Sequence, residues 1–332
     1  MTLPRVLLVS LGGTITMTPG SGGGIVPTLT GADLVAAVPA LKTVAEIEAV
    51  SPFRLPGASL TLAHLRDVAA LIDTRLAGED LAGAIVVQGT DTIEETAYML
   101  DLLVGGDKPV VVVGAMRGAA APGADGPANL LAATVAASSP ALRGLGTVVV
   151  LNDTIHAARR VQKTSTHLPS AFESPGAGPI GHVVEDRVHL HARPARVGAI
   201  PGGLDQPGAP VALVTATLGD DGRILRRLPE LGYRGLVVEA MGAGHVPDVL
   251  VEPLAGLVGA MPVVLGTRVA SGPVFTRTYD FPGSEMDLLR RGLIHGGGIG
   301  GLKARLLLSL LLGAGVSGDG LAAAFARYAG SN

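Results

Sequence analysis

The 332-residue chain contains no cysteine and no tryptophan, and few other aromatic residues. The absence of cysteine excludes disulfide bonds, thiolate metal sites and cysteine nucleophiles. No stretch approaches the ~18 consecutive apolar residues of a membrane-spanning helix. The apolar run 6–9 is too short for the hydrophobic region of a signal peptide, and it leads directly into a glycine turn. We therefore expect a soluble, cytoplasmic protein with no membrane partner.

Charge is also scarce, at 16% of the residues, with 25 Lys and Arg against 28 Asp and Glu. The net charge of -3 is spread without a long run of one sign. Nucleic-acid-binding surfaces normally show a basic stripe, so no nucleic-acid partner is expected. The histidines show no HExxH spacing and the acidic residues no calcium-loop pattern, so no metal site is expected.

Short apolar runs alternate with amphipathic stretches along the whole chain, in which 48% of the residues are hydrophobic. Strands buried on both faces are apolar at nearly every position, and β-α alternation favours parallel strands. The fold class predicted is α/β, with a doubly wound, mainly parallel sheet in a larger N-terminal domain. Its expected strands are 5–9, 83–87, 109–114 and 147–151, and its expected helices are 31–38, 61–76, 92–103 and 128–137.

A segment rich in Pro and Gly, without apolar periodicity, interrupts this pattern at 191–210. Such composition is typical of a linker. It predicts an N-terminal catalytic domain at 1–190 and a smaller C-terminal α/β domain at 211–332. The expected elements of the second domain are strands 211–216, 235–239 and 262–266 and a helix at 302–312.

Polar segments follow four of the expected strands, at 12–16, 88–92, 114–118 and from Asn152 onward. Open α/β sheets bind ligands beyond the carboxyl ends of their strands. We therefore expect the functional side chains at this edge of the sheet.

The first of these segments is Gly12-Gly13-Thr14. Taken alone, it is more often a strand-to-helix turn in which glycine supplies a positive φ. A phosphate loop is not indicated, because neither GxxxxGK[ST] nor GxGxxG spacing is present at this turn. The other possibility is that the turn exposes the Thr14 hydroxyl.

The second segment reads QGTDTIEETA, from Gln88 to Ala97. Two residue pairs in it have capping-box spacing, which predicts the start of a helix. The same start places the Thr90 hydroxyl and the Asp91 carboxylate beside free backbone N–H groups, where an anion can bind. A cap and a binding site are therefore both compatible with this segment.

Two further residues are candidates for chemistry. Glycine and alanine at 114–115 allow a ligand close to the backbone, so the N–H of Ala115 could donate to an oxyanion. Lys163 stands among small hydroxylic residues, where most lysines are simply solvated. Held near Asp91 it would instead be a candidate base, because desolvation lowers the pKa of a lysine.

With these segments in order, the sequence resembles the bacterial-type L-asparaginase family, also called asparaginase/glutaminase. The resemblance rests on LGGTI at 11–15, QGTDTIEETA at 88–97 and KARLLL at 303–308. It covers essentially the whole chain and implies a two-domain fold that uses no cofactor. It also implies a homo-oligomer, a dimer or more usually a homotetramer, in which a neighbouring subunit completes each site.

Carried over to this chain, the resemblance makes Thr14 the nucleophile that attacks a side-chain amide carbon. Thr90, Asp91 and Lys163 form a second cluster that polarises a hydroxyl or water, and Asp91 also holds the substrate's amino group. The backbone N–H groups of Thr90 and Ala115 receive the oxyanion. A threonine hydroxyl is a weak nucleophile at neutral pH, so it needs such a proton acceptor nearby.

The chain departs from the family in the stretch 18–27, which is expected to form a lid over the site. The family's tyrosine is absent there, and Tyr279 is the expected replacement. Gln88 stands where the family often has histidine, and Glu285 is expected to bind the substrate's amino group from a neighbouring subunit. The remaining substrate-binding residues expected are Gly57, Ala58 and Ser59, either through the backbone of Gly57 or through the Ser59 hydroxyl.

The function predicted is hydrolysis of L-asparagine to L-aspartate and ammonia through a threonyl ester. Glutaminase activity stays open, since one methylene in a pocket is worth only ~1 to 3 kcal/mol of discrimination. A related amidotransferase subunit that feeds ammonia to glutamyl-tRNA carries an extra N-terminal domain, and it is not the expectation here. The alternative from another class is a non-catalytic amino-acid sensor, which the missing lid tyrosine favours.

Overall fold

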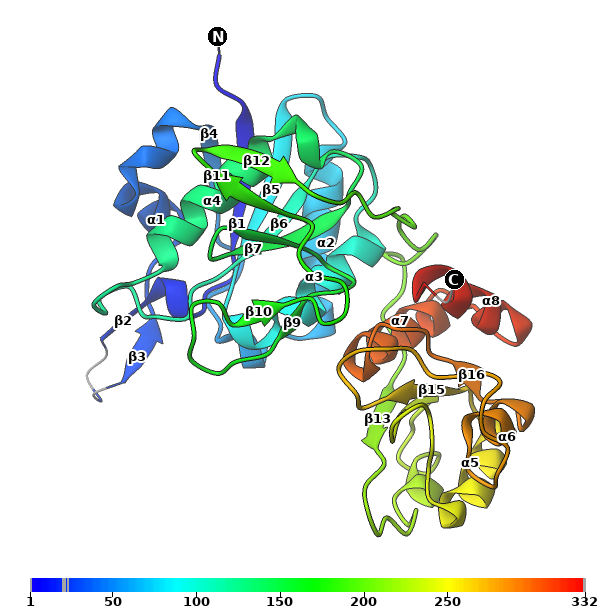
Figure 1. The fold of residues 1–332 in the computed structure, drawn as a ribbon. Helices are drawn as coiled ribbons and strands as arrows, with labels where there is room; N and C mark the ends of the chain where they lie inside the picture. The colour runs from blue at the N-terminus through cyan, green and yellow to red at the C-terminus, as the bar shows by residue number, and fades with distance from the viewer. Residues whose placement is uncertain (1, 20–21, 23, 331–332) are drawn as a thin grey trace. The chain divides into compact units, whose positions relative to one another are not determined.

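The computed structural model describes residues 2–19, 22 and 24–330. The chain divides into two compact units, Met1–Ala199 and Ile200–Asn332 (Figure 1). This division falls inside the segment 191–210, which was predicted as a linker. Each unit has its own sheet and its own apolar core.

An eight-stranded sheet forms the centre of unit 1. Five strands are parallel and lie in the order β7-β6-β5-β1-β4, and three further strands continue the sheet antiparallel beyond β7. The α/β class and the mainly parallel sheet are thereby confirmed. The strands are β1 (Arg5–Ser10), β4 (Glu46–Val50), β5 (Leu81–Val87), β6 (Val110–Val113), β7 (Thr147–Leu151), β8 (Thr154–Ala157), β11 (Gly181–Val184) and β12 (Arg187–Leu190).

Helices cover both faces of this sheet, which explains why its central strands are apolar at consecutive positions. Helix α4 (Gly126–Ser138) packs against β5, β6 and β7 and shares a core with alternate strand residues such as Val87 and Val113. Helices α2 (Leu62–Leu76) and α3 (Ile93–Leu103) pack on these strands from the other face, and α1 (Gly31–Ala37) lies beside β4. Each of the four helices begins and ends within two residues of its predicted bounds.

Short hairpins extend the carboxyl edge of the sheet. Strands β2 (Met17–Pro19) and β3 (Ile25–Pro27) pair antiparallel in the stretch expected to be a lid, of which residues 20, 21 and 23 lie outside the described residues. Strands β9 (Gln162–Lys163) and β10 (Phe172–Glu173) form a second hairpin. These hairpins, β4 and the three antiparallel strands were not predicted.

Unit 2 contains a parallel four-stranded sheet in the order β13-β14-β15-β16. Helix α7 (Gly301–Gly313) packs on β13 and β14, α5 (Val251–Val258) on β15, and α8 (Asp319–Tyr328) on β16. The three predicted strands and the predicted helix are confirmed within one residue at each end. The elements are β13 (Val211–Thr215), β14 (Gly235–Ala240), β15 (Val263–Thr267) and β16 (Ile294–His295), with α6 (Glu285–Arg290) before the last strand.

Candidate active site

Three glycines bring three loops into backbone contact at the carboxyl edge of unit 1. A Cβ built on Gly13 would lie 2.0 Å from the backbone nitrogen of Gly89, and one built on Gly57 would lie 2.9 Å from the Gly89 carbonyl oxygen. Side chains at these positions would force the loops apart. Glycine therefore places the loops after β1 and β5, and the turn η3 (Gly57–Ser59), against one another.

Thr14 begins the short helical turn η1 (Thr14–Thr16) directly after β1. Gly13 precedes it with a φ of 86°, a conformation that glycine adopts without strain. The backbone N–H and the side-chain hydroxyl of Thr16 both donate to the Gly13 carbonyl, at 2.9 and 2.8 Å. The turn therefore holds Thr14, which is half-buried, at the sheet edge.

Lys163 joins the second predicted cluster from β9. Its ammonium Nζ donates to Thr90 Oγ1 at 2.9 Å and lies 2.8 Å from Asp91 Oδ1. The Lys163 side chain is 18% exposed and that of Asp91 is 66% exposed, so the carboxylate faces solvent and the ammonium faces the protein. Lys163 is 73 positions from Thr90 and 72 from Asp91, and the three residues meet as predicted.

The capping-box spacing in this segment correctly predicted the start of a helix, although Thr92 does not cap that helix with its side chain. Residues 90–92 make a separate turn, η4 (Thr90–Thr92), and α3 begins after it with no side-chain cap from Thr92. The Thr92 hydroxyl donates instead to the Gly57 carbonyl at 3.1 Å, and Asp91 pairs with Lys163. The segment therefore uses its polar side chains between loops rather than within the helix.

Gln88 supports the loop after β5 from within the protein. Its side chain is fully buried, and Nε2 donates to the Gly89 carbonyl and to Thr92 Oγ1, each at 3.2 Å. Beside it, Gly57 is buried while Ala58 and Ser59 are exposed. The predicted substrate-binding turn thus lies against the predicted catalytic loops and faces solvent.

The loop after β6 completes the edge and depends on two residues whose roles were not predicted. The Asp125 carboxylate accepts hydrogen bonds from the backbone N–H groups of Met116 and Arg117, both at 2.9 Å. Asn129 donates to the Gly114 carbonyl at 3.1 Å and accepts from the Asn152 N–H at 2.9 Å. These contacts fix the backbone on either side of the buried Ala115.

Glu285 and Tyr279 belong to unit 2. The Glu285 carboxylate is fully buried, and Oε1 accepts from the N–H groups of Thr278 and Tyr279 at 3.0 and 2.8 Å. Burial alone would raise the pKa of Glu285, but these backbone hydrogen bonds outweigh it and hold the pKa below its ordinary value. A substrate amino group would reach this carboxylate only after the turn at 278–279 opened, and the binding role of Glu285 stays a prediction.

Tyr279 is part of an aromatic cluster around His245. The rings of Tyr279 and Phe281 pack edge-on against the His245 ring at centroid distances of 4.8 and 5.2 Å. His245 Nε2 lies 3.3 Å from Glu285 Oε2. Tyr279 is 41% exposed, so its hydroxyl-bearing ring is available at the surface of this unit.

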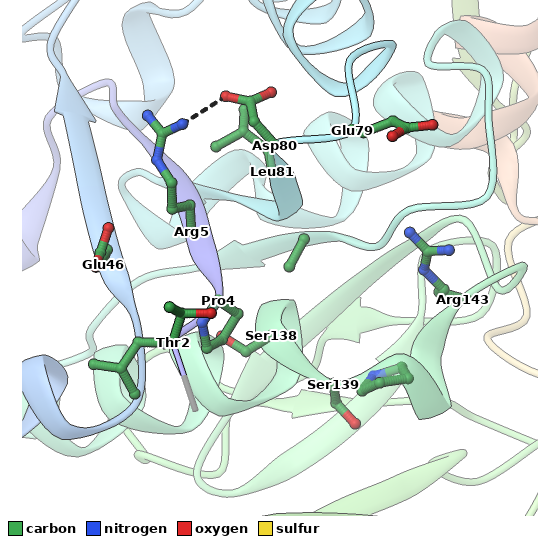
Figure 2. A pocket seen from close by; sticks show the side chains of 13 residues that line it. Thr2, Pro4, Arg5, Glu46, Glu79, Asp80, Leu81, Ser138, Ser139 and Arg143 are labelled. Carbon is green, nitrogen blue, oxygen red and sulfur yellow. Dashed lines mark hydrogen bonds and ion pairs between the residues drawn. The ribbon is translucent and has the colours of Figure 1, made fainter.

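A hollow of about 760 Å³ lies at the opposite end of the unit 1 sheet (Figure 2). Its lining includes Pro4 and Arg5 at the start of β1, Asp80 and Leu81 at the start of β5, and Ser138 at the end of α4. Ligands of open parallel sheets bind at the carboxyl ends of the strands. The converging hydroxyl, ammonium and carboxylate groups therefore locate the site better than the volume of this hollow does.

Four of the eight histidines lie on or directly after the three antiparallel strands of the same sheet. His182 and His189 are directly paired on β11 and β12, His191 follows β12, and His156 is on β8. His189 and His191 have HxH spacing, which occurs in some metal sites. Among the described residues, however, no group of three or more histidines, aspartates or glutamates is arranged to hold a metal ion.

Hydroxyl, ammonium and carboxylate groups at the carboxyl edge of a parallel sheet, beside two backbone turns, are suited to an enzyme of the α/β class that uses a hydroxyl nucleophile. Residues 5–196 match the family described as asparaginase, N-terminal, and residues 210–325 match the glutaminase/asparaginase C-terminal domain. The chain belongs to the asparaginase/glutaminase family. Within the described residues, no helix is both long and apolar enough to cross a membrane.

Named relatives are similar over nearly their full length. The chain is 33% identical to the L-asparaginase of Bacillus licheniformis, over 93% of this chain and 95% of that protein. It is 35% identical to a probable L-asparaginase of Deinococcus radiodurans, over 98% of each. The crystal structure of a probable cytoplasmic L-asparaginase from Campylobacter jejuni superposes with a TM-score of 0.88 at 30% identity, covering 98% of this chain and 100% of that one.

Proposed function

We propose that this protein hydrolyses L-asparagine to L-aspartate and ammonia, with Thr14 as the nucleophile. The main support is the position of the Lys163 ammonium, which is hydrogen-bonded to Thr90 and paired with Asp91. The loop that contains Thr90 and Asp91 lies in backbone contact with the Thr14 turn, because both loops have glycine at the point of contact. Names of the relatives support asparagine as the substrate. The family's two-domain match supports it as well.

In the proposed first step, the Thr14 oxygen attacks the side-chain amide carbon, and its proton passes to the Asp91 carboxylate of the Thr90, Asp91 and Lys163 cluster. The carbonyl oxygen becomes an oxyanion and accepts hydrogen bonds from the backbone N–H groups of Thr90 and Ala115. Removing one such donor typically lowers the rate by ~10² to 10³. When the tetrahedral intermediate collapses, the C–N bond breaks, the leaving amino group takes that proton back from the cluster to depart as ammonia, and an aspartyl ester remains on Thr14.

In the proposed second step, the same cluster polarises a water molecule that attacks the ester carbon. The ester bond breaks, L-aspartate leaves and the Thr14 hydroxyl is restored. Asp91 is suited to hold the substrate's amino group because its carboxylate is largely exposed. The exposed turn at Ala58 and Ser59 is suited to the substrate's carboxylate.

The direct test is ammonia release from L-asparagine and L-glutamine by the purified protein. Thr14→Ala should abolish release, while Thr14→Ser, which keeps a hydroxyl, should retain part of it. Thr43→Ala is a matched control, since Thr43 is an exposed threonine whose hydroxyl donates to Ala40. An active Thr14→Ala variant would reject the nucleophile, and the ratio of the two substrates would measure any glutaminase side activity.

The non-catalytic sensor is the second candidate, because the lid stretch has no tyrosine. A wild-type protein that binds either amino acid in calorimetry but releases no ammonia would establish it. We propose Tyr279 as the substitute for that tyrosine. Its hydroxyl is tested by the kcat of Tyr279→Phe, and a wild-type kcat would reject this role.

We also infer that the protein is a homo-oligomer in which a neighbouring copy completes each site. The exposed aromatic residues of unit 2 support this, since Phe275, Tyr279 and Phe281 are each at least 41% exposed. Sedimentation equilibrium of the active protein would give the oligomeric state, and a fully active monomer would reject the inference. A cytoplasmic location is proposed as well; relatives include a probable periplasmic L-asparaginase of Haemophilus influenzae, so cell fractionation decides it.

A further inference from the structure

A buried histidine and a buried serine are hydrogen-bonded behind the hairpin that carries Lys163. His156 Nδ1 lies 2.9 Å from Ser174 Oγ, and the two residues are 3% and 5% exposed. His156 belongs to β8, which is paired with the central strand β7. Ser174 directly follows β10, the partner strand of β9. The bond therefore connects the rigid sheet to the hairpin.

The hairpin has little else in the way of regular pairing. Only two residue pairs join its strands, Lys163 with Phe172 and Gln162 with Glu173. One further backbone bond, from the Thr164 N–H to the Ala171 carbonyl at 2.7 Å, continues the ladder. Two-stranded hairpins of this size are not stable by themselves in water. The position of Lys163 therefore depends on what anchors the hairpin to the rest of unit 1.

His156 supplies a contact that an apolar residue could not. Its other ring nitrogen, Nε2, is buried and has no hydrogen-bond partner among the described residues. Burying an unpaired nitrogen is unfavourable, so a leucine would fill this space at lower free energy if packing were the only requirement. The hydrogen bond to Ser174 is what the histidine adds.

We propose that the His156–Ser174 hydrogen bond is a positioning element that holds the Lys163 ammonium against Thr90 and Asp91. This inference rests on the proposed function, in which Lys163 takes part in catalysis. His156 and Ser174 are both buried, so their proposed role does not include contact with substrate. The connection runs from β8 through His156 and Ser174 to β10, across the strand pair to Lys163, and from its Nζ to Thr90 Oγ1 at 2.9 Å.

Loss of this bond should lower kcat more than it raises KM. The hairpin would gain lateral freedom, and a displacement of about 1 Å in a catalytic group can lower a rate ~10²-fold. Because the hairpin keeps its other contacts, we expect a kcat about tenfold lower in Ser174→Ala and in His156→Leu. The pH profile of kcat should shift in both variants, since the ammonium would sit in a changed environment.

The test compares these variants with His156→Asn and with a control in the other unit. Asparagine can place a polar atom close to the position of Nδ1, so His156→Asn should recover most of the wild-type kcat. The double variant His156→Leu/Ser174→Ala should be no slower than either single variant, because both remove the same bond. Ser309→Ala is the matched control: Ser309 is fully buried, donates to the Ala209 carbonyl at 2.7 Å and belongs to unit 2. It should lower the melting temperature and leave kcat unchanged.

A Ser174→Ala variant with wild-type kcat and pH profile, in an active protein, would overturn the inference. An equal loss of kcat in Ser309→Ala and Ser174→Ala would overturn it as well, because the effect would then come from general destabilisation. If the wild-type protein itself is inactive, the proposed function fails first. Hydrogen exchange at the Thr164 amide then tests the anchoring alone, and unchanged exchange in Ser174→Ala would reject it.

Discussion

The Glu285 carboxylate accepts a hydrogen bond from the backbone N–H of Tyr279 at 2.8 Å, so the two residues predicted to act from unit 2 are joined. The same oxygen accepts from the Thr278 N–H at 3.0 Å. Any change at Glu285 therefore also moves Tyr279. An experiment on either residue has to separate the shape of this turn from contact with substrate.

Glu285→Ala should destabilise the protein, while Glu285→Gln should be milder. Alanine leaves two backbone donors without their acceptor, which costs about 2 to 4 kcal/mol of unfolding free energy. Glutamine keeps an oxygen that can accept both bonds. Denaturant unfolding at pH 7 measures the difference, and Glu252→Ala, which removes an exposed carboxylate, is the control. If Glu285→Gln instead raised KM strongly at unchanged stability, the carboxylate would be a substrate ligand.

The sign of the pH effect at Glu285 follows from its lowered pKa. Its stabilising contribution is fully present above the pKa of the unfolded chain. It is lost as the pH falls through the lower pKa of the folded protein. The Glu285→Gln variant should therefore lose less stability than the wild type over that acid range.

Gly13→Ala should abolish activity and destabilise unit 1. The position has a φ of 86°, and the new Cβ would meet the Gly89 nitrogen at 2.0 Å, so the Thr14 and Thr90 loops must separate. We expect a kcat at least ~10²-fold lower. Gly144→Ala is the matched control, because Gly144 has a φ of 78° with nothing within 4 Å of the new Cβ. It should cost only about 1 to 2 kcal/mol and leave kcat unchanged.

A Gly13→Ala enzyme with normal kinetics would show that the contact between these loops is not needed for catalysis. If Gly13→Ala and Gly144→Ala lost kcat equally, the loss would come from general destabilisation. The comparison therefore separates close approach of the backbone from the left-handed conformation that the two glycines share.

His156 makes the stability of unit 1 sensitive to mild acid. Burial, with a smaller contribution from the charge of His182, lowers its pKa from 6.5 to about 4. Above pH 6.5 the His156 ring is neutral in both the folded and the unfolded chain, so its burial does not lower the unfolding free energy through protonation. As the pH falls from 6.5 towards 4, only the unfolded chain takes up the proton, and unfolding becomes easier by up to about 3 kcal/mol.

Unfolding free energies measured between pH 7 and pH 4 check this prediction. The curve should be flatter for His156→Asn, which does not titrate in this range. His167→Gln, at an exposed histidine, should follow the wild-type curve. Parallel curves for wild type and His156→Asn would contradict the lowered pKa.

Strands buried on both faces were predictable because their apolar runs do not depend on neighbours. The unpredicted β4 reads EIEAV, and its charge at Glu48 is explained by two arginines from other elements. Arg75 donates to that carboxylate through two guanidinium nitrogens, each at 2.7 Å, and Arg5 lies 3.5 Å from it. The hairpin of β9 and β10 is too short to produce any periodic pattern. Local sequence therefore predicts a strand well only where burial is the same at every position.

The site residues in sequence motifs were predictable, whereas local sequence did not predict their contacts with residues distant in the sequence. Thr14, Thr90 and Lys163 were predicted from family motifs, and the structure places the last two together. The start of α3 was predicted from local spacing and is confirmed within one residue, but the pairing of Asp91 with Lys163, 72 residues away, left no local signal. Asn129 had no local signal for its role, since its partners Gly114 and Asn152 lie on other loops.

Replacing Glu185 and Asp186 by Asn and Gly should stabilise the protein. These two residues connect β11 to β12 with φ values of 50° and 56°, in the left-handed region that disfavours glutamate. A two-residue hairpin turn with positive φ at both positions prefers Asn followed by Gly. The turn from β7 to β8 has the same conformation, with φ values of 50° and 57°, and already places Asn152 first.

Glu185→Asn/Asp186→Gly should therefore raise the unfolding free energy by about 1 kcal/mol, the relief of backbone strain less the added freedom of glycine in the unfolded chain. Thermal unfolding of wild type and variant at one pH measures it. Glu185→Gln removes one of the two charges but keeps a side chain unsuited to positive φ, so it should leave the melting temperature unchanged. If Glu185→Gln were as stabilising as the double substitution, the gain would come from charge rather than from the turn.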